Sequence, residues 1–149
     1  MNRLEIYTDG ACDNFHSRVG GWAWVMVRNG QHGSKSRRVV DTTSNRMEME
    51  AIIQALESYQ KQSVLTVEEI VIYSDSEYSI NILSGKWRIR ANTKNQDLIR
   101  RFQAIQSQID AAVSFEKVKA HSGHPWNDLA DSLANGAMID SYYNKRGFQ

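Results

Sequence analysis

The sequence predicts an α/β domain built on a mixed sheet, and three patterns carry that prediction. From Leu4 to Asp9 apolar and polar residues alternate, a period of two that is typical of a β-strand. Residues 70–73 form a continuous apolar run, which indicates a parallel strand covered on both faces. Between them, residues 46–59 carry apolar side chains at helical spacing.

The composition fits one globular domain over residues 1–149. Apolar and charged residues make up 41% and 23% of the 149 residues, as in ordinary soluble proteins. No stretch is apolar enough for a membrane span, and Glu5 and Asp9 interrupt any signal-like region. The single cysteine, Cys12, excludes a disulfide framework, so we expect a cytoplasmic protein. The start at Met1 favours a free-standing one.

The first third of the chain predicts an antiparallel meander. The first strand ends at Asp9, and Gly10 lets the chain leave it steeply. Residues 22–27 form a strand that is apolar on both faces, Asn29-Gly30 marks a hairpin turn, and residues 34–42 return as a more polar strand. Taken alone, Asp9 could be an ordinary turn residue.

Capping residues at 42–45 precede the predicted helix 46–59, and its phase separates two glutamates. Glu48 shares the apolar stripe with Ile52, Ala55 and Tyr59. Glu50 shares its stripe with Gln54, Glu57 and Lys61, which predicts the solvent face. If either acid is functional, we therefore expect Glu48.

The strand at 70–73 follows a loop at 61–66 and stops at Ser74-Asp75-Ser76, before a short helix at 77–83. Ligands of open α/β sheets gather beyond the carboxyl ends of parallel strands, and Asp75 occupies such an end, as Asp9 does. The alternative for Asp75 is a cap of the following helix.

The last third predicts an amphipathic helix, a final strand at 113–118, a loop at 121–125 and a helix at 126–141. The amphipathic helix is marked by Leu98, Phe102, Ile105 and Ile109. The buried stripe of the final helix comprises Ala130, Leu133, Ala134 and Ala137. Asp131 borders that stripe in line with Asn127, whereas Asp128 and Ser132 point outward.

Four acids thus lean inward at element ends or helix edges: Asp9, Glu48, Asp75 and Asp131. Packed together without compensation they would repel one another, and oxygen ligands favour magnesium or manganese as the compensating ion. Zinc held by Cys12, His121 and His124 is the alternative, but their spacing matches no usual zinc pattern.

Two basic groups indicate a nucleic-acid partner, although the formal net charge is only +1. The first is interleaved with Trp87 and comprises Lys86, Arg88, Arg90, Lys94, Arg100 and Arg101. The second is Lys35, Arg37 and Arg38 on the predicted hairpin, for which a solvated face is an equal alternative.

Four motifs in order resemble type 1 ribonuclease H over nearly the whole chain. They are Tyr7-Thr8-Asp9-Gly10, Thr43-Ser44-Asn45-Arg46-Met47-Glu48, Ser74-Asp75-Ser76, and His121-Ser122-Gly123-His124-Pro125 with Asn127 and Asp131. The resemblance implies a five-stranded mixed sheet flanked by helices. It also implies an endonuclease that hydrolyses the RNA strand of RNA/DNA hybrids, leaving 5′-phosphate and 3′-hydroxyl ends.

By the same resemblance, Asp9, Glu48, Asp75 and Asp131 would bind two Mg²⁺ ions, for which Mn²⁺ can substitute. His121 matches the family's loop histidine, which assists proton transfer or product release; its alternative is a structural loop histidine. We expect a monomer that binds hybrid and no membrane.

The substrate contacts implied by the resemblance fall into two groups. Those on the hybrid's minor groove, including the ribose 2′-hydroxyl, are Gly10, Ala11, Cys12, Asn14, Ser44, Asn45, Glu48, Ser76 and Asn127. Thr43 and Asn95 would hold a phosphate of the DNA strand, along whose sugars Trp87 would lie. A core position is the alternative for Trp87.

The sequence departs from the family pattern in two places. The run between Asp75 and His121 is too short for the full extra basic helix of well-known bacterial members, so affinity would rest on Lys86, Arg88 and Arg90. Asp41 stands near the expected phosphate pocket, where a basic residue is common, and Ser44-Asn45 replaces two amide side chains.

Three rival interpretations remain open at this point. A DNA-strand nuclease or transposase-like enzyme would share the carboxylates but would need neither the 2′-hydroxyl contacts nor the segment from His121 to Asp131. A hybrid-binding module without catalysis would not need all four acids. The chain could also be one domain cut from a polyprotein.

Overall fold

The computed structural model describes residues 2–62 and 66–145, with the backbone alone for 140–145. The strands of this part are β1 (Arg3–Cys12), β2 (Gly20–Arg28), β3 (Gln31–Val39), β4 (Glu69–Ser74) and β5 (Ala112–Lys117). Its helices are α1 (Ser44–Lys61), α2 (Glu77–Leu83), α3 (Gln96–Ser107) and α4 (Pro125–Lys145). No helix of these residues is both long enough and apolar enough to cross a membrane.

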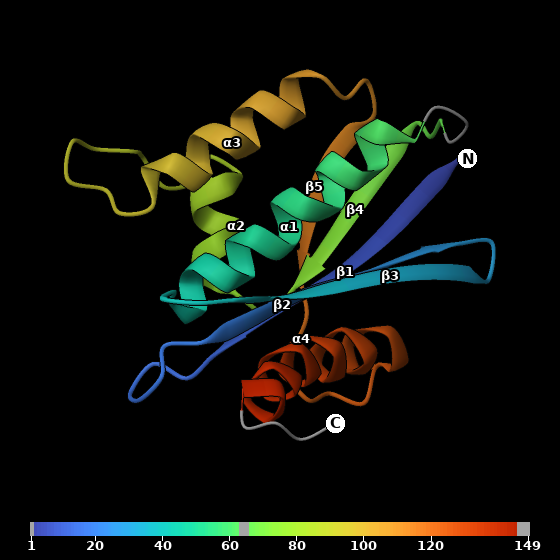
Figure 1. Cartoon of the computed structure of the whole chain (residues 1–149). Helices are drawn as coiled ribbons and strands as arrows, with labels where there is room; N and C mark the ends of the chain where they lie inside the picture. The colour runs from blue at the N-terminus through green and yellow to red at the C-terminus, as the bar shows by residue number, and fades with distance from the viewer. Residues whose placement is uncertain (1, 63–65, 146–149) are drawn as a thin grey trace.

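The five strands form one mixed sheet in the order β3-β2-β1-β4-β5 (Figure 1). Strands β1, β2 and β3 pair antiparallel, and β1, β4 and β5 pair parallel. The predicted fold class, an antiparallel meander joined to parallel strands, is therefore confirmed.

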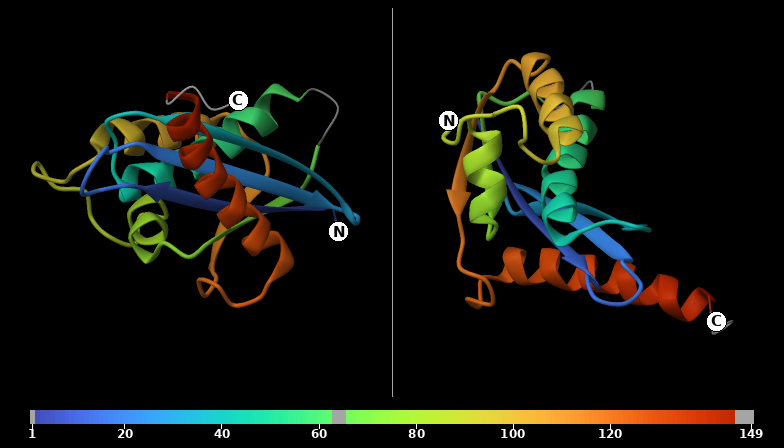
Figure 2. Two further views of the ribbon diagram at one scale, coloured as in Figure 1. Left: turned by 60° about the horizontal axis from the view of Figure 1, so that its bottom comes forward. Right: turned by 90° about the vertical axis from the view of Figure 1, so that its left-hand side faces the viewer.

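The sheet separates two hydrophobic clusters. Trp22, Trp24 and Met26 of β2 join the cluster under α1 and α3, whereas Val25 and Val27 face the other way with Ala130 of α4. Figure 2 shows α4 alone on its side of the sheet, with the other helices opposite. Strand β2 is consequently buried on both faces, as its sequence predicts.

Two glycines allow helices to approach the sheet closely. A Cβ atom on Gly10 would lie 2.4 Å from Glu48 N, and one on Gly21 would lie 2.4 Å from Ala134 O. The prediction that β1 ends at Asp9 was wrong, because the strand continues to Cys12 and pairs with β2 up to Gly20. Gly10 therefore serves close packing of α1, not an exit of the chain.

The prediction that Glu48 lies on the packed face of α1 is confirmed, whereas the prediction that Glu50 faces solvent is wrong. Glu48 is buried with Ile52, Ala55 and Tyr59 on the side that faces the sheet. The side chain of Glu50 is only 16% exposed, because α3 packs beside α1 and Arg101 Nη1 lies 2.8 Å from Glu50 Oε2. The same guanidinium contacts Glu57 Oε1 at 2.9 Å. A cation from another helix thus covers the stripe predicted to face solvent.

The remaining boundaries differ in small ways from the predictions. Helix α2 spans the predicted 77–83, but α3 ends before Ile109, and the third strand runs over 31–39, not 34–42. Residues 84–95 contain no helix, which agrees with the expected lack of the extra basic helix. Of the loop predicted at 61–66, residues 63–65 lie outside the described part.

Candidate active site

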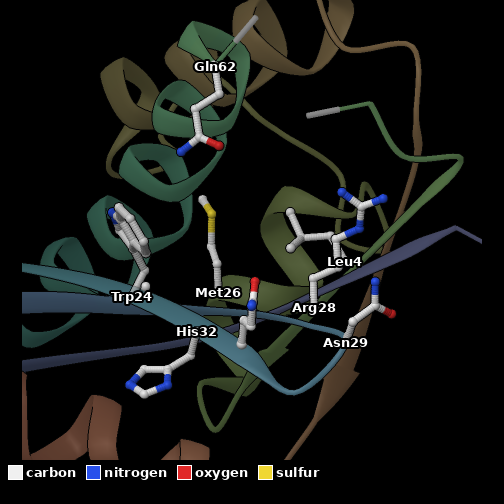
Figure 3. Close-up of a pocket in the computed structure, with 9 residues that line it drawn as sticks. Leu4, Trp24, Met26, Arg28, Asn29, His32 and Gln62 are labelled. Atoms are coloured by element: carbon white, nitrogen blue, oxygen red, sulfur yellow. The ribbon is translucent and has the colours of Figure 1, made fainter. Parts of the chain in front are cut away.

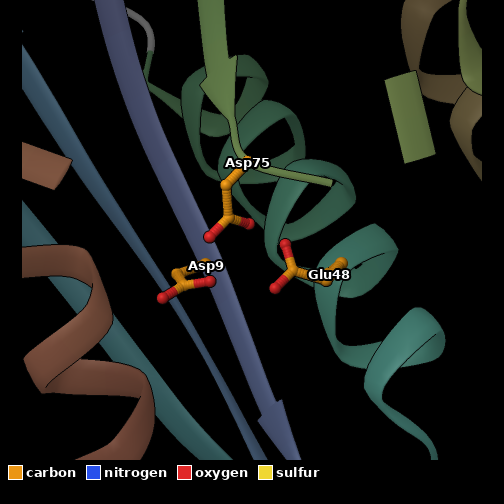
Figure 4. A group of neighbouring side chains, drawn as sticks. All are labelled: Asp9, Glu48 and Asp75. Atoms are coloured by element: carbon orange, nitrogen blue, oxygen red, sulfur yellow. The ribbon is translucent and has the colours of Figure 1, made fainter. Parts of the chain in front are cut away.

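Three carboxylates, from β1, from α1 and from the turn after β4, converge beside the carboxyl end of β4 (Figure 4). Tyr7 of β1 pairs with Tyr73 of β4, so Asp9 and Asp75, each two residues further on, lie level with one another. Helix α1 supplies Glu48 across the close contact at Gly10. One oxygen of each carboxylate lies within 4.8 Å of the other two.

Two of the three acids are buried, Asp75 is half-buried, and none of them forms an ion pair with a lysine or arginine of the described residues. Asp9 is 5% exposed and Glu48 8% exposed. The backbone N–H of Gly10 donates to Asp9 Oδ1 and to Glu48 Oε1, both at 2.9 Å. The second oxygen, Glu48 Oε2, is buried and finds no hydrogen-bond partner among the described residues. A buried carboxylate oxygen in that state is costly unless a ligand occupies it.

Burial and the neighbouring acids raise the pKa of all three groups. Burial raises the pKa of Asp9 to about 7, with further contributions from a hydrogen bond to Asp131 and from the charge of Asp75. Burial and then the charge of Asp9 hold the pKa of Glu48 well above its usual range. The pKa of Asp75 is raised by burial and by the charge of Asp131. Such shifts cluster at functional sites.

Asp131 and His121 flank this cluster. Asp131 lies on the half-exposed edge of α4 and interacts electrostatically with both Asp9 and Asp75. His121 Nδ1 is 4.0 Å from Asp131 Oδ2, on a side chain that is 79% exposed. The sequence prediction for α4 is confirmed in its phase, since Asn127 and Ala134 are buried in line with Asp131.

The donor set fits a hard divalent cation. The three converging groups offer oxygen atoms only, and Glu48 Oε2 has a vacant acceptor position. The alternative of zinc is not supported, since no metal-binding group with Cys12 or a histidine occurs in the described part of the chain. There Cys12 Sγ donates to Thr42 O at 3.5 Å, and the ring of His124 stacks on Tyr7.

The expected minor-groove contacts lie along the rim of this cluster. Gly10, Ala11 and Cys12 are consecutive residues of β1, and Ser44 and Asn45 open α1. Asn14 Nδ2 donates to Ser44 Oγ at 2.9 Å, which ties the loop after β1 to α1. Ser76 is the N-cap of α2 and accepts from Ser79 N, so the alternative of Asp75 as that cap is wrong. Asn127 is buried at the start of α4.

The structure brings the two expected phosphate contacts, Thr43 and Asn95, to one residue, Arg46. Thr43 Oγ1 accepts from the backbone N–H of Arg46, and Asn95 Oδ1 accepts from Arg46 Nη1 at 3.3 Å. Arg46 also pairs with Asp97 at 2.7 Å, which lowers the pKa of Asp97 to about 2. Sequence reasoning assigned no role to Arg46, although it lies inside the motif from Thr43 to Glu48.

Trp87 lies on the surface, so its alternative as a core residue is wrong. The indole is 44% exposed and packs edge-on against Tyr78, whose hydroxyl accepts from Asn95 Nδ2. Tyr78 thereby links Trp87, in the basic loop at 84–95, to Asn95 and so to Arg46.

A separate cavity of about 370 Å³ lies at the opposite end of α1 (Figure 3). Its lining includes Leu4, Trp24, Met26, Arg28, His32 and Gln62. None of the described residues that line it is a carboxylate, so the cluster of Asp9, Glu48 and Asp75 remains the place for metal chemistry in this part of the chain.

A model of the RNase H family matches residues 1–139. A protein named Ribonuclease H from Verminephrobacter eiseniae (strain EF01-2) is 39% identical over 146 residues, covering 91% of this chain and 90% of that protein. A second protein of that name, from Jannaschia sp. (strain CCS1), is 37% identical and covers 99% and 98% of the two chains.

Two solved structures share the architecture. LC11-RNase H1 in complex with an RNA/DNA hybrid superposes with a TM-score of 0.81 at 23% identity, covering 93% of this chain and 99% of that one. At that identity the likeness establishes the fold alone. RNase H1 from Halobacterium salinarum NRC-1 has a TM-score of 0.75 at 26% identity, with 93% and 98% covered.

Proposed function

Because the chain belongs to the RNase H family, we propose that it is an endonuclease that hydrolyses the RNA strand of RNA/DNA hybrids. The observation that carries this proposal is the convergence of Asp9, Glu48 and Asp75 on one point, where none of the three forms an ion pair with a lysine or arginine of the described residues and Glu48 Oε2 has no hydrogen-bond partner among them. A binding module would gain nothing from three mutually repelling acids.

Asp9, Glu48 and Asp75 would hold Mg²⁺, with Asp131 completing the set for a second ion and Mn²⁺ as a substitute. What such ions supply is Lewis-acid chemistry: a water of lowered pKa as the nucleophile and neutralised charge on the departing 3′-oxygen. Attack on phosphorus breaks the P–O3′ bond, so the products carry 5′-phosphate and 3′-hydroxyl ends.

The chain's own residues orient the reactants and move the protons. The N–H of Gly10 fixes one oxygen of Asp9 and one of Glu48, which leaves Glu48 Oε2 free to accept a ligand. His121 stands beside Asp131 on an exposed loop, where its imidazole can exchange a proton with the leaving oxygen and assist product release.

Recognition of the hybrid rests on the rim residues. The ribose 2′-hydroxyl, which distinguishes RNA from DNA, would be contacted by Glu48, Asn14, Asn45 and the backbone near Cys12 and Ser76. Thr43 and Asn95 would bind a phosphate of the DNA strand, and the exposed face of Trp87 would lie on its sugars. LC11-RNase H1, of the same fold, has been solved with a hybrid bound.

We expect the chain to act as a monomer and a single domain over residues 1–149, in the cytoplasm. The free thiol of Cys12 suits a reducing compartment. Sedimentation in the presence and absence of hybrid would measure the oligomeric state directly.

The test is a cleavage assay with end-labelled RNA/DNA hybrid, RNA duplex and DNA duplex, in Mg²⁺ and then in EDTA. Cutting confined to the RNA strand of the hybrid and abolished by EDTA supports the proposal. Cutting of the DNA duplex would favour a DNA-strand nuclease. Hybrid binding without cutting in either Mg²⁺ or Mn²⁺ would make the chain a binding module.

A further inference from the structure

Phe15 presents an aromatic ring to solvent on the loop that joins β1 to β2. The residue is 91% exposed, more than Trp87 or any other large apolar side chain in the described part of the chain. Burying a phenylalanine is favourable, so a ring left in water on an otherwise well-packed molecule is suited to meet a partner. The loop that carries it, residues 13–19, joins β1 to β2.

The loop is closed by Asp13, so Phe15 occupies a defined position at its tip. Asp13 Oδ1 accepts from the N–H of His16 at 3.2 Å, and Oδ2 accepts from Ser17 Oγ at 3.2 Å. The N–H of Arg18 donates to the carbonyl of Asp13 at 2.9 Å. A ring on such a loop loses little conformational freedom when it binds.

Hydrogen bonds on both sides of the tip anchor the loop to the start of α1. Asn14 exchanges two hydrogen bonds with Ser44, and the N–H of Thr42 donates to the carbonyl of Arg18. Ser44 precedes Glu48 by four residues, which is about 6 Å along a helix axis. The anchor of the loop on α1 therefore lies about one helical turn from Glu48.

The same side of the molecule carries the basic loop. In Figure 1 the β1–β2 loop, the N-terminus of α1 and the loop at 84–95 all project to the left, and Figure 2 shows this side face-on. His16 and Arg18 next to Phe15 repeat the combination of aromatic and basic residues found around Trp87. Such combinations suit a sugar-phosphate backbone with exposed base edges.

We propose that Phe15 is a substrate-binding residue that packs its ring into the minor groove of the hybrid beside the cleaved bond. Apolar side chains placed in a minor groove wedge against base steps and loosen their stacking. The inference rests on the proposed function, because the groove is reached only if the hybrid lies over Asp9, Glu48 and Asp75. It assigns the β1–β2 loop a direct contact beyond those of Asn14 and Cys12.

The test compares Phe15→Ala with Phe15→Tyr, which keeps the ring, and with the control Ile139→Ala, which removes an exposed apolar side chain from α4. We expect Phe15→Ala to raise KM for the hybrid roughly tenfold, with kcat within about twofold of wild type. Phe15→Tyr and Ile139→Ala should retain the wild-type KM. All three should keep the wild-type melting temperature, because both positions are exposed.

A second measurement locates the contact. In an Asp75→Asn background, the DNA strand carries the fluorescent base 2-aminopurine at successive positions around the cleavage site. Phe15 should brighten the probe at one or two neighbouring positions, and Phe15→Ala should abolish that signal. An unchanged KM and an unchanged probe signal in Phe15→Ala would overturn the inference. If the wild-type protein cleaved no hybrid at all, the proposed function itself would fail.

Discussion

Glu48 and Glu50 stand two residues apart on α1, and their surroundings are opposite. Both side chains are largely withdrawn from water. Glu50 accepts two hydrogen bonds from Arg101 of α3, at 2.8 and 3.1 Å. Glu48 faces Asp9 and Asp75 and retains an oxygen without a partner among the described residues. The first arrangement joins two helices, and the second could hold a cation from outside the chain.

The two glutamates differ in whether the protein itself compensates their charge. A half-buried carboxylate paired with a guanidinium is accounted for by packing, because its charge is compensated inside the protein. A buried group of acids without such a cation costs free energy, and a folded protein that keeps it implies a ligand. Activity and stability should therefore respond in opposite directions at the two positions.

The largest expected effect is on cleavage. Asp75→Asn removes the charge of one converging carboxylate with little change of shape, so turnover should fall at least about 1000-fold while hybrid binding persists. Glu50→Gln, as the matched control, should leave turnover within about twofold of wild type. Turnover is measured as the initial rate on end-labelled hybrid, and binding is measured by fluorescence anisotropy. Loss of turnover in Glu50→Gln but not in Glu48→Gln would contradict the assignment of Glu48 to the site and of Glu50 to helix packing.

The next effect is on stability in EDTA at pH 8. Glu48→Gln removes a repelling buried charge and should stabilise the protein by about 1 kcal/mol. Glu50→Gln leaves Arg101 with Glu57 alone and should destabilise it by about 1 kcal/mol. For a domain of this size each change corresponds to roughly 2–4 °C in Tm. Shifts of the same sign in both variants would contradict the comparison.

A pH series should separate the two regions further. The folded-state pKa of Asp9 is about 7, raised from 3.8, so between these values the folded protein binds more protons than the unfolded chain. The metal-free protein should therefore lose stability as pH rises through this window. Mg²⁺ should restore it, so the gain in Tm on adding Mg²⁺ should be small at pH 5 and larger at pH 8. A gain that is constant from pH 5 to 8 would argue against metal binding at Asp9.

The contrast in that series is Asp97. Arg46 lowers its pKa to about 2, so the stabilisation from this pair is present above pH 3.8 and lost only as pH falls toward 2. Asp97→Asn should thus lower Tm between pH 5 and 8 by a similar small amount at each pH, with or without Mg²⁺.

The smallest effect is expected at Asp41, which pairs with Arg18 at 3.5 Å while both remain exposed. Asp41→Asn removes a negative charge near the proposed phosphate contacts, and asparagine tolerates the positive φ of 51° at this position. Hybrid affinity at low salt should increase about two- to threefold, and the gain should shrink as salt screens the charges. An affinity that is unchanged at every salt concentration would show that Asp41 does not lie near the bound DNA strand.

The order of the elements, the type of sheet and the face of α1 that carries Glu48 could all be predicted from the sequence. These features depend on periodicity and turn chemistry, which act over a few residues. The motifs that contain Asp9, Glu48 and Asp75 also predict that these acids meet, together with Asp131, which lies at the flank of the cluster. Asp9 and Asp75 lie at the same level of the sheet because β1 and β4 pair in parallel. In the sequence, only the apolar run at 70–73 indicates that pairing.

The neighbours of each polar residue, in contrast, depend on how the elements pack and could not be predicted from the sequence. Periodicity marks the polar face of α1 but does not show that α3 covers it, so the sequence predicts solvent for Glu50, whereas Arg101 of α3 pairs with it. Glycine is common in turns, but the reason for a glycine at position 10 is the close packing of α1. A Cβ atom there would lie 2.4 Å from Glu48 N. Arg46, Asn95 and Tyr78 come from distant parts of the chain, and the exposure of Phe15 depends on every neighbour that could have covered it. Local sequence sets the conformation of each element, whereas compensation of charge and exposure of a ring depend on long-range packing.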